Sequence, residues 1–331
     1  MSEKELLDTR ISDLGLTIEG SILEPHIERL YEELDARGIK AKPHCWLSDD
    51  WFSPDGIPGI AIPFYLAHPR LMKLERKQMV EVEGGTKLWL MRILRHEAGH
   101  ALDTAYRLHR RRSYKEVFGN YFTPYPDSYR PRPRSKSYVL HLDPCYAQSH
   151  PAEDFAETFA VWLAPGRKWE QEYRGWKALS KLHFVEELMG EVAGEAVKVR
   201  SRIRIEPVSK IRKTLRDHYS ILHDRFQMDC TETNFDAQLL KVFIRLKREE
   251  LDLKASFFLQ KYRGEVCRIV GQFTGENPYN VNQIIIQLAK RADELGLFAH
   301  GEIATIKGRV ISLLTALTMD IINSNQHRIA L

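Results

Sequence analysis

The stretch "ILRHEAGHALD" occupies residues 93–103 and contains the pattern His-Glu-x-x-His at residues 96–100. Residues four apart on an α-helix lie on one face, so His96 and His100 can present two imidazoles to one metal ion. Glu97 lies beside them and can reach a water molecule at an open position of that metal. A catalytic zinc ion needs three protein ligands. The stretch therefore predicts part of a zinc site whose third ligand comes from elsewhere in the chain.

The helix that carries this pattern is expected to run from about residue 86 to residue 108. The preceding "GGT" supplies a break and an N-cap. Small and apolar residues recur at helical spacing along it and give it a core-facing side. These residues are Leu90, Leu94, Ala98, Ala101 and Ala105.

Asp103 is the nearest candidate for the third ligand. It shares a helix face with the histidines, but the seven residues from His96 to Asp103 span about 10 Å of continuous helix. Metal–ligand bonds of about 2 Å cannot bridge that separation. The following "ALDTAY" has no Gly or Pro that would end the helix early. We therefore expect Asp103 to support the structure rather than bind the metal.

A second segment, "CYAQSHPAEDFAETFAVWL" at residues 145–163, offers a pair of carboxylates. Pro151 suits the first turn of a helix and Pro165 would end it. Glu153 and Glu157 are four residues apart, so one can bind zinc while the other accepts a hydrogen bond from a ligand imidazole. Burying two carboxylates on an apolar helix is unfavourable unless they are paired or bind a metal. The alternative is an exposed acidic face that binds nothing.

The two segments together resemble a known kind of zinc centre. His-Glu-x-x-His followed by Tyr-x6-Glu-x-Phe-Ala-Glu-x-Phe at residues 146–159 resembles the centre of anthrax lethal-factor-like gluzincin peptidases. The resemblance implies that Glu153 is the third ligand, that Glu157 hydrogen-bonds a ligand histidine and that Tyr146 stabilises the oxyanion. The same stretches are also similar to a bacterial family of zinc-binding metallopeptidases, over about residues 9–190.

Composition and charge indicate a soluble cytoplasmic protein. The chain has 331 residues, 43% of them hydrophobic, and a net charge of +4, which allows a packed core. The first residues are polar and mixed in charge, unlike a signal peptide. The most apolar run, residues 310–322, is interrupted by polar residues and is expected to be a buried helix. The four cysteines are scattered, so we expect free thiols.

The predicted fold class is α+β, with a zincin-like domain at residues 1–205, a basic helical linker at 206–230 and a helical bundle at 231–331. The first domain should combine a helix at residues 20–38, active-site helices and a small mixed sheet. Strands are expected at residues 39–48, 57–68 and 137–142; prolines in the second make it an edge strand. Helices of the bundle are expected within residues 235–262, 280–296 and 302–323.

The predicted function is a zinc-dependent peptidase that acts on a peptide or protein, with Zn²⁺ as its cofactor, Glu97 as general base and no membrane association. An extended substrate would pair with the edge strand near residues 59–64. The alternative is a latent binding or adaptor protein that acts through its C-terminal helices, which could also bind a protein partner or self-associate.

Basic runs and several additional histidines and tyrosines allow more than one interpretation. Two basic runs, at residues 101–140 and 196–216, could favour acidic partners, although solvated surfaces are the simpler reading. Nucleic-acid binding is not expected, because no nucleic-acid-binding motif accompanies them. His150 is expected to cap a helix or pack, His141 is a neighbouring extra histidine, and the tyrosines of residues 119–136 are expected to pack in a surface loop.

Overall fold

The computed structural model describes residues 2–142, 145–226, 235–250, 252–323 and 329–330. Contacts divide the chain into two compact units. The first consists of Met1–Leu74, Glu83–His218 and the last two residues, and the second of Glu75–Val82 and Tyr219–Ile329. The boundaries expected at residues 205 and 230 stay a prediction, and residues 227–230 lie outside the described chain.

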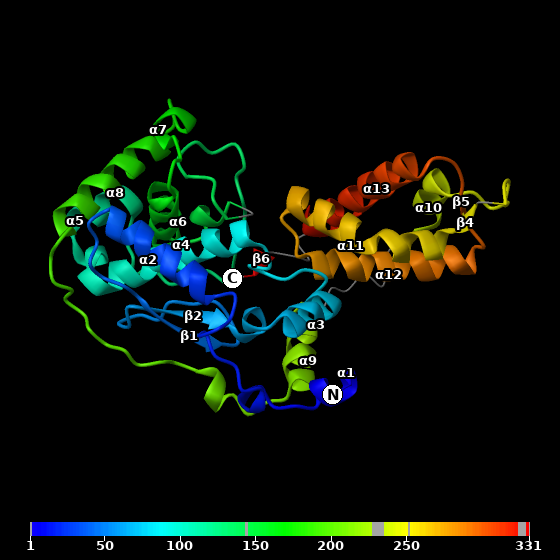
Figure 1. The fold of residues 1–331 in the computed structure, drawn as a ribbon. Coiled ribbons are helices and arrows are strands. Elements are labelled where there is room, and N and C mark those ends of the chain that lie inside the picture. Colours follow the sequence, from blue (N-terminus) through cyan, green and yellow to red (C-terminus); the bar gives the residue numbers. More distant parts are fainter. Residues whose placement is uncertain (1, 143–144, 227–234, 251, 324–328, 331) are drawn as a thin grey trace. The chain divides into compact units, whose positions relative to one another are not determined.

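The first unit is mostly helical, and a two-stranded sheet of β1 (His44–Ser48) and β2 (Gly59–Pro63) lies within it (Figure 1). Its α-helices are α1 (Glu3–Leu7), α2 (Glu24–Ala36), α4 (Lys87–Tyr106), α5 (Arg112–Phe118), α6 (Pro151–Leu163), α7 (Trp169–Glu172) and α8 (Ala178–Val192). Helices α3 (Pro69–Met79) and α9 (Leu215–Arg225) continue into the second unit. Its strands also include the short β3 (Ser128–Tyr129). Short 3₁₀ turns are η1 (Ile11–Asp13), η2 (Phe64–Ala67), η3 (Leu108–Arg110), η4 (Tyr146–Gln148) and η5 (Val208–Lys210).

Helix α4 forms the centre of this unit, and α2, α6 and β2 pack against it (Figure 1). Its middle is almost entirely buried, so its charged side chains need partners inside the core. Arg95 finds one on α2, where its guanidinium donates two 2.7 Å hydrogen bonds to Glu33. A bidentate pair of this kind fixes orientation as well as distance, and it holds α2 in register with α4.

The sheet consists of β1 and β2, which are parallel and pair from His44 with Gly59 to Ser48 with Pro63. Among the described strands, β2 pairs with β1 alone and is therefore an edge strand, as its prolines predict, but its outer edge is partly occupied. The chain folds back across that edge: Ala61 N–H donates to Phe52 O at 2.8 Å, and the Ser53 hydroxyl donates to Gly59 O at 2.9 Å. A substrate could add a strand here only by displacing these groups.

The strand expected at residues 137–142 is also absent. Its backbone amides bind side chains instead of a neighbouring strand. Leu140 N–H donates to the Tyr173 hydroxyl at 3.0 Å, and Leu142 N–H donates to Glu157 at 2.7 Å. Periodic apolar residues predicted a strand correctly in β1 and wrongly here, because no strand of the described chain lies beside this segment to complete a ladder.

The second unit contains α10 (Asp236–Val242), α11 (Ala255–Thr274), α12 (Pro278–Glu294) and α13 (Ile303–Asn323), with the two-residue strands β4 (Leu253–Lys254) and β5 (Phe298–Ala299). The strand β6 (Ile329–Ala330) spans the boundary between the units. Helix was expected across residues 235–262, but the described residues between α10 and α11 are not helical. There β4 pairs with β5, and Asp252 accepts two backbone N–H groups from a turn. Turn chemistry therefore overrides helical periodicity at this point.

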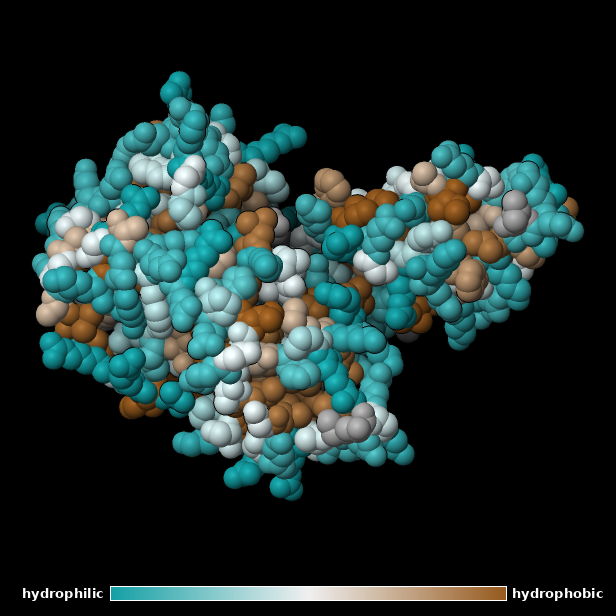
Figure 2. Space-filling view, viewed as in Figure 1, coloured by the Kyte–Doolittle hydropathy of each residue, from teal (hydrophilic) through white to brown (hydrophobic). Residues whose placement is uncertain are grey.

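The four helices of the second unit enclose an apolar core, which includes Phe258, Val270, Ile284 and Leu314. Residues 310–322 lie within α13, as expected. Among the described residues, no helix is long and apolar enough to cross a bilayer. Hydrophilic side chains cover most of the face seen in Figure 2, and apolar patches interrupt them on both units.

Cys45, Cys145 and Cys267 form no disulfide among the described residues. This agrees with the expectation for these three cysteines. Cys230 lies outside the described residues.

Candidate metal centre

Helix α4 begins and ends where local chemistry requires it to. The Thr86 side chain accepts a hydrogen bond from Trp89 N at 3.3 Å, as the expected N-cap. Arg107 ends the helix in a left-handed conformation, with φ of 55°. The predicted helix is thus confirmed within two residues at each end, and its histidines lie near its middle.

Helices α4 and α6 cross closely because Gly99 has no side chain. A Cβ atom at Gly99 would lie 2.9 Å from Ala156 Cα and 3.2 Å from Phe159 Cδ1. Gly99 is the residue before His100, and Ala156 lies between Glu153 and Glu157. The two small residues therefore bring the histidines of one helix to the carboxylates of the other.

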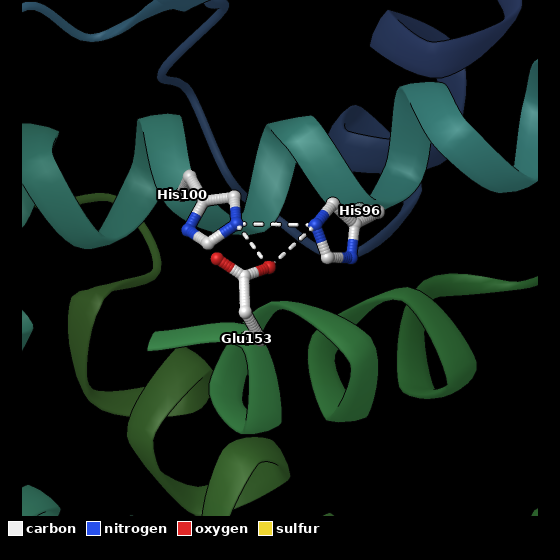
Figure 3. A group of neighbouring side chains, drawn as sticks. All are labelled: His96, His100 and Glu153. Atoms are coloured by element: carbon white, nitrogen blue, oxygen red, sulfur yellow. Dashed lines mark hydrogen bonds and ion pairs between the residues drawn. The ribbon is translucent and has the colours of Figure 1, made fainter. Parts of the chain in front are cut away.

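Three side chains converge at this crossing (Figure 3). His96 Nε2, His100 Nε2 and one carboxylate oxygen, Glu153 Oε2, are each 3.1 Å from the other two. His96 and Glu153 are buried, and His100 is half-buried. Figure 3 shows the two rings projecting from α4 toward a carboxylate that rises from α6.

The donor set fits a zinc ion. Two imidazole nitrogens and a carboxylate oxygen are ordinary zinc ligands, and bonds of about 2.0–2.2 Å at tetrahedral angles separate ligand atoms by roughly 3.3–3.5 Å. The 3.1 Å separations are close to that value. All three atoms can therefore serve one small ion, and the group could hold a metal.

The metal-facing side chains are themselves held by hydrogen bonds. His96 Nδ1 lies 2.8 Å from Glu157 Oε1, and the other oxygen of Glu157 accepts Leu142 N–H at 2.7 Å. On the opposite side of the group, the Tyr125 hydroxyl donates to Glu153 Oε1 at 2.7 Å. Glu157 and Tyr125 bind the far atoms, Nδ1 of His96 and Oε1 of Glu153, so Nε2 and Oε2 remain turned toward the centre. These hydrogen bonds fix the orientation of both side chains.

The ionisation of the group follows from its burial and its charges. Burial opposes the charge on Glu153, but His100 and His96 outweigh it and hold the pKa of that carboxyl well below its usual range. Burial raises the pKa of Glu97. Glu97 Oε2 is buried without a hydrogen-bond partner, although buried carboxylate oxygens normally have one. A water or substrate atom in front of it would satisfy this oxygen.

Tyr146 lies at the edge of the group, with its ring centroid 5.6 Å from that of His96. The preceding Cys145 adopts a left-handed conformation, φ 66°, which is sparsely populated for residues other than glycine. Burial, and then the nearby Glu153 and Glu97, raise the pKa of Tyr146. The phenol therefore keeps its proton at neutral pH and can donate a hydrogen bond.

The remaining polar candidates have structural partners. Asp103 accepts His109 N–H at 2.7 Å and contacts His109 Nδ1 at 3.0 Å, and it is not among the residues grouped around the centre. His150 caps α6: its Nδ1 accepts Ala152 N–H at 3.1 Å. His141 Nε2 lies 3.0 Å from Arg92 O, and burial lowers its pKa to about 4. These placements match the structural roles expected for Asp103 and His150.

Two contributors were not found from the sequence. Gly99 was read only as a variable position of the motif, and its role depends on Ala156, which is remote in sequence. Tyr125 was expected to pack in a loop, and it does stack on His150 with centroids 3.8 Å apart, but its hydroxyl also binds Glu153. A loop tyrosine carries no spacing signal that would reveal such a contact.

Comparison with known proteins relates the segment that carries this site to one protein family. No curated protein and no solved structure matches the chain. Residues 67–171 match the model of a family described as "Putative zinc-binding metallo-peptidase". This range includes both α4 and α6. The segment that is similar to these metallopeptidases therefore contains the whole group that could hold a metal ion, His96, His100 and Glu153.

Proposed function

We propose that this protein is a zinc-dependent peptidase of the gluzincin type, with His96, His100 and Glu153 as ligands. The observation that carries the proposal is the buried group of three converging ligand atoms next to a carboxylate oxygen without a partner, Glu97 Oε2. A site that only stabilised the fold would not require this carboxylate. The similarity of residues 67–171 to metallopeptidases supports the same reading.

Each nearby side chain has a role in peptide hydrolysis. When bound, zinc supplies a Lewis acid that activates a water molecule and polarises the scissile carbonyl. Glu97 accepts the proton of the attacking water and passes it to the leaving amine. Tyr146 donates a hydrogen bond to the negative oxygen that develops on the carbonyl carbon. Glu157 accepts a hydrogen bond from His96 Nδ1–H, which leaves Nε2 without a proton and turned toward the centre.

The direct test separates metal binding from turnover. Glu97→Gln keeps the shape of the side chain but removes the base, so we expect zinc content to stay near one per chain while peptide cleavage falls at least about a hundredfold. Glu153→Ala removes a ligand, so we expect both zinc and cleavage to be lost. The measurements are elemental analysis after dialysis and cleavage of a fluorogenic peptide library.

These outcomes also discriminate the alternative of a latent adaptor. Full zinc occupancy in Glu153→Ala would contradict the ligand set. Zinc binding without cleavage of any library peptide by the unsubstituted protein would favour a binding protein on a zincin scaffold. Proteins trapped by Glu97→Gln and released by the unsubstituted enzyme would identify the natural substrate.

A further inference from the structure

A cavity in the first unit carries a strong positive charge. Its volume is about 510 Å³, and it lies where α4 gives way to η3 and α5. We call it the basic pocket; its lining includes His109, Arg110, Arg111, Arg112, Lys115 and Tyr121. Four of these six side chains are permanent cations at neutral pH.

The charge of the basic pocket is only partly neutralised. Arg111 pairs with Glu191, and Arg112 pairs with Glu116 at 2.8 Å. Arg110 and Lys115 are exposed and have no acidic partner among the described residues. Two cations in one concave site therefore remain available to an anion.

The wall of the basic pocket is fixed to the helix of the metal centre. Asp103, one turn beyond His100 on α4, binds His109 through both the backbone N–H and the ring. The His109 ring stacks on Tyr121, with centroids 4.3 Å apart, and the Tyr121 hydroxyl donates to Asp55. Asp103, which is not a metal ligand, thus fixes the position of the basic pocket relative to His96 and His100 on the same helix.

A short stretch of chain joins the pocket to the metal centre. Tyr121 lines the basic pocket, and Tyr125, four residues later, hydrogen-bonds the proposed ligand Glu153. Four residues span at most about 14 Å. A bound peptide advances about 3.3 Å per residue, so the pocket is within reach of groups two to four residues from the reacting carbonyl.

We propose that the basic pocket binds a carboxylate of the peptide substrate, two to four residues from the bond that is cut. The proposal rests on the proposed peptidase function and names a substrate class for it. The carboxylate is either an acidic side chain or the free C-terminus, since both present the same two oxygens to Arg110 and Lys115. Guanidinium and ammonium groups bind such oxygens through charge-assisted hydrogen bonds.

The test compares cleavage of matched peptides by a charge-removing variant and its control. One pair of peptides, blocked at both ends, differs by Glu or Gln at the second to fourth position from the cut. A second pair differs by a free or amidated C-terminus. The variant is Arg110→Gln/Lys115→Gln, and the control is Arg174→Gln/Lys177→Gln, which removes the same charge from exposed residues outside the pocket.

We expect the unsubstituted protein to favour one acidic member by about five- to tenfold in kcat/KM, the size expected for two partly exposed ion pairs. The pair that shows the preference identifies the source of the carboxylate. The ratio should fall toward one in the pocket variant and persist in the control. Equal cleavage of both pairs, or equal loss of preference in the control, would overturn the proposal.

A binding measurement separates this proposal from the peptidase function itself. In the Glu97→Gln background, fluorescence anisotropy of labelled peptides reports the acidic preference without turnover. Preferential binding that the pocket variant loses supports the basic pocket even if no peptide is cleaved, whereas absent cleavage refutes only the peptidase function. Tighter binding of a single-stranded oligonucleotide, lost in the same variant, would instead assign the pocket to nucleic acid.

Discussion

The two units bury very different side chains. The core of the second unit consists of apolar residues such as Phe258, Ile284 and Leu314. The first unit buries ionisable groups along α4 and α6, namely Arg95, His96, Glu97, Asp103, Glu153, Asp154 and Glu157. Buried charges stabilise a fold only when paired or bound to a metal. Among the described residues, the second unit buries fewer such groups, namely Glu75, Asp252 and Glu276, so the comparison indicates that buried charge lowers the intrinsic stability of the first unit more than that of the second.

All six tryptophans lie in the ranges of the first unit. Tryptophan fluorescence therefore reports the unfolding of this unit alone, while hydrogen exchange resolved by peptide reports both units. The comparison can thus be tested one unit at a time.

Metal removal should have the largest effect. At free zinc about 1,000-fold above its Kd, binding stabilises the folded state by about 4 kcal/mol. A chelator should therefore lower the tryptophan-monitored melting temperature, and exchange should rise in α4 and α6 but not in α11–α13. In Glu153→Ala the chelator should have no effect.

The second unit supplies an internal control for this experiment. Glu249, Asp252 and His300 are also close enough to hold a metal. However, Asp252 already binds the backbone N–H of Arg248 and of Glu249, and also His300. We therefore expect one zinc per chain; chelator-dependent exchange around Asp252 would show that the contrast between the units is wrong.

Acid should be the next strongest perturbation of the first unit. Burial, with Lys213 adding to it, lowers the pKa of His218 from 6.5 to about 4. The unfolded chain then binds more protons between these values, so the stability from the neutral ring is complete above pH 6.5 and is lost as pH falls to 4. The loss is on the order of 3 kcal/mol.

Urea unfolding followed by tryptophan fluorescence at pH 7 and pH 4.5 measures the slope of the free energy of unfolding against pH. His218→Leu should reduce the acid dependence, because the group that takes up the proton on unfolding is gone. Replacement of the exposed His68 by Gln should leave the slope as it was. An unchanged slope in His218→Leu would assign the acid sensitivity to other groups.

One glycine in each unit lies at a similarly close helix contact, so replacing each by alanine should cause a similar steric clash but different effects on zinc binding. Added methyl groups at Gly99 and Gly271 would lie 2.9 Å from Ala156 Cα and 2.8 Å from Glu276 O. Each substitution to Ala should cost about 2 kcal/mol in its own unit, but only Gly99→Ala should weaken zinc binding. Gly190, which has open space around it, is the control: Gly190→Ala should stabilise α8 by about 0.5–1 kcal/mol. Equal zinc affinity in Gly99→Ala would show that the helix crossing does not set the ligand geometry.

The smallest effect is expected from Tyr125→Phe. It removes the hydrogen bond to Glu153 Oε1 and keeps the ring that stacks on His150. Zinc affinity, measured by competition with a chelator, should fall about tenfold. Tyr138→Phe is the matched control, since its ring contacts Lys181 and no hydrogen bond of its hydroxyl appears among the described contacts. If both variants lost affinity equally, Tyr125 would have no specific role in holding Glu153.

The sequence by itself determined features that depend on neighbouring residues. Helical spacing placed His96 and His100 on one face, and Thr86 and Pro151 marked the starts of the two site helices. Helix length alone excludes Asp103 as a ligand, and its hydrogen bond with His109 N–H agrees with that. Such features follow from the period of an α-helix and from capping, which are local.

Only the tertiary structure decided which remote groups meet. Residues 137–142 form a loop because two of their backbone N–H groups donate hydrogen bonds to the side chains of Tyr173 and Glu157. Phe52 and Ser53 form hydrogen bonds with the outer edge of β2. Tyr125 reached Glu153 in the same way. A backbone or side-chain group forms whichever hydrogen bond the packed fold brings within about 3 Å, and no spacing rule along the chain specifies that neighbour.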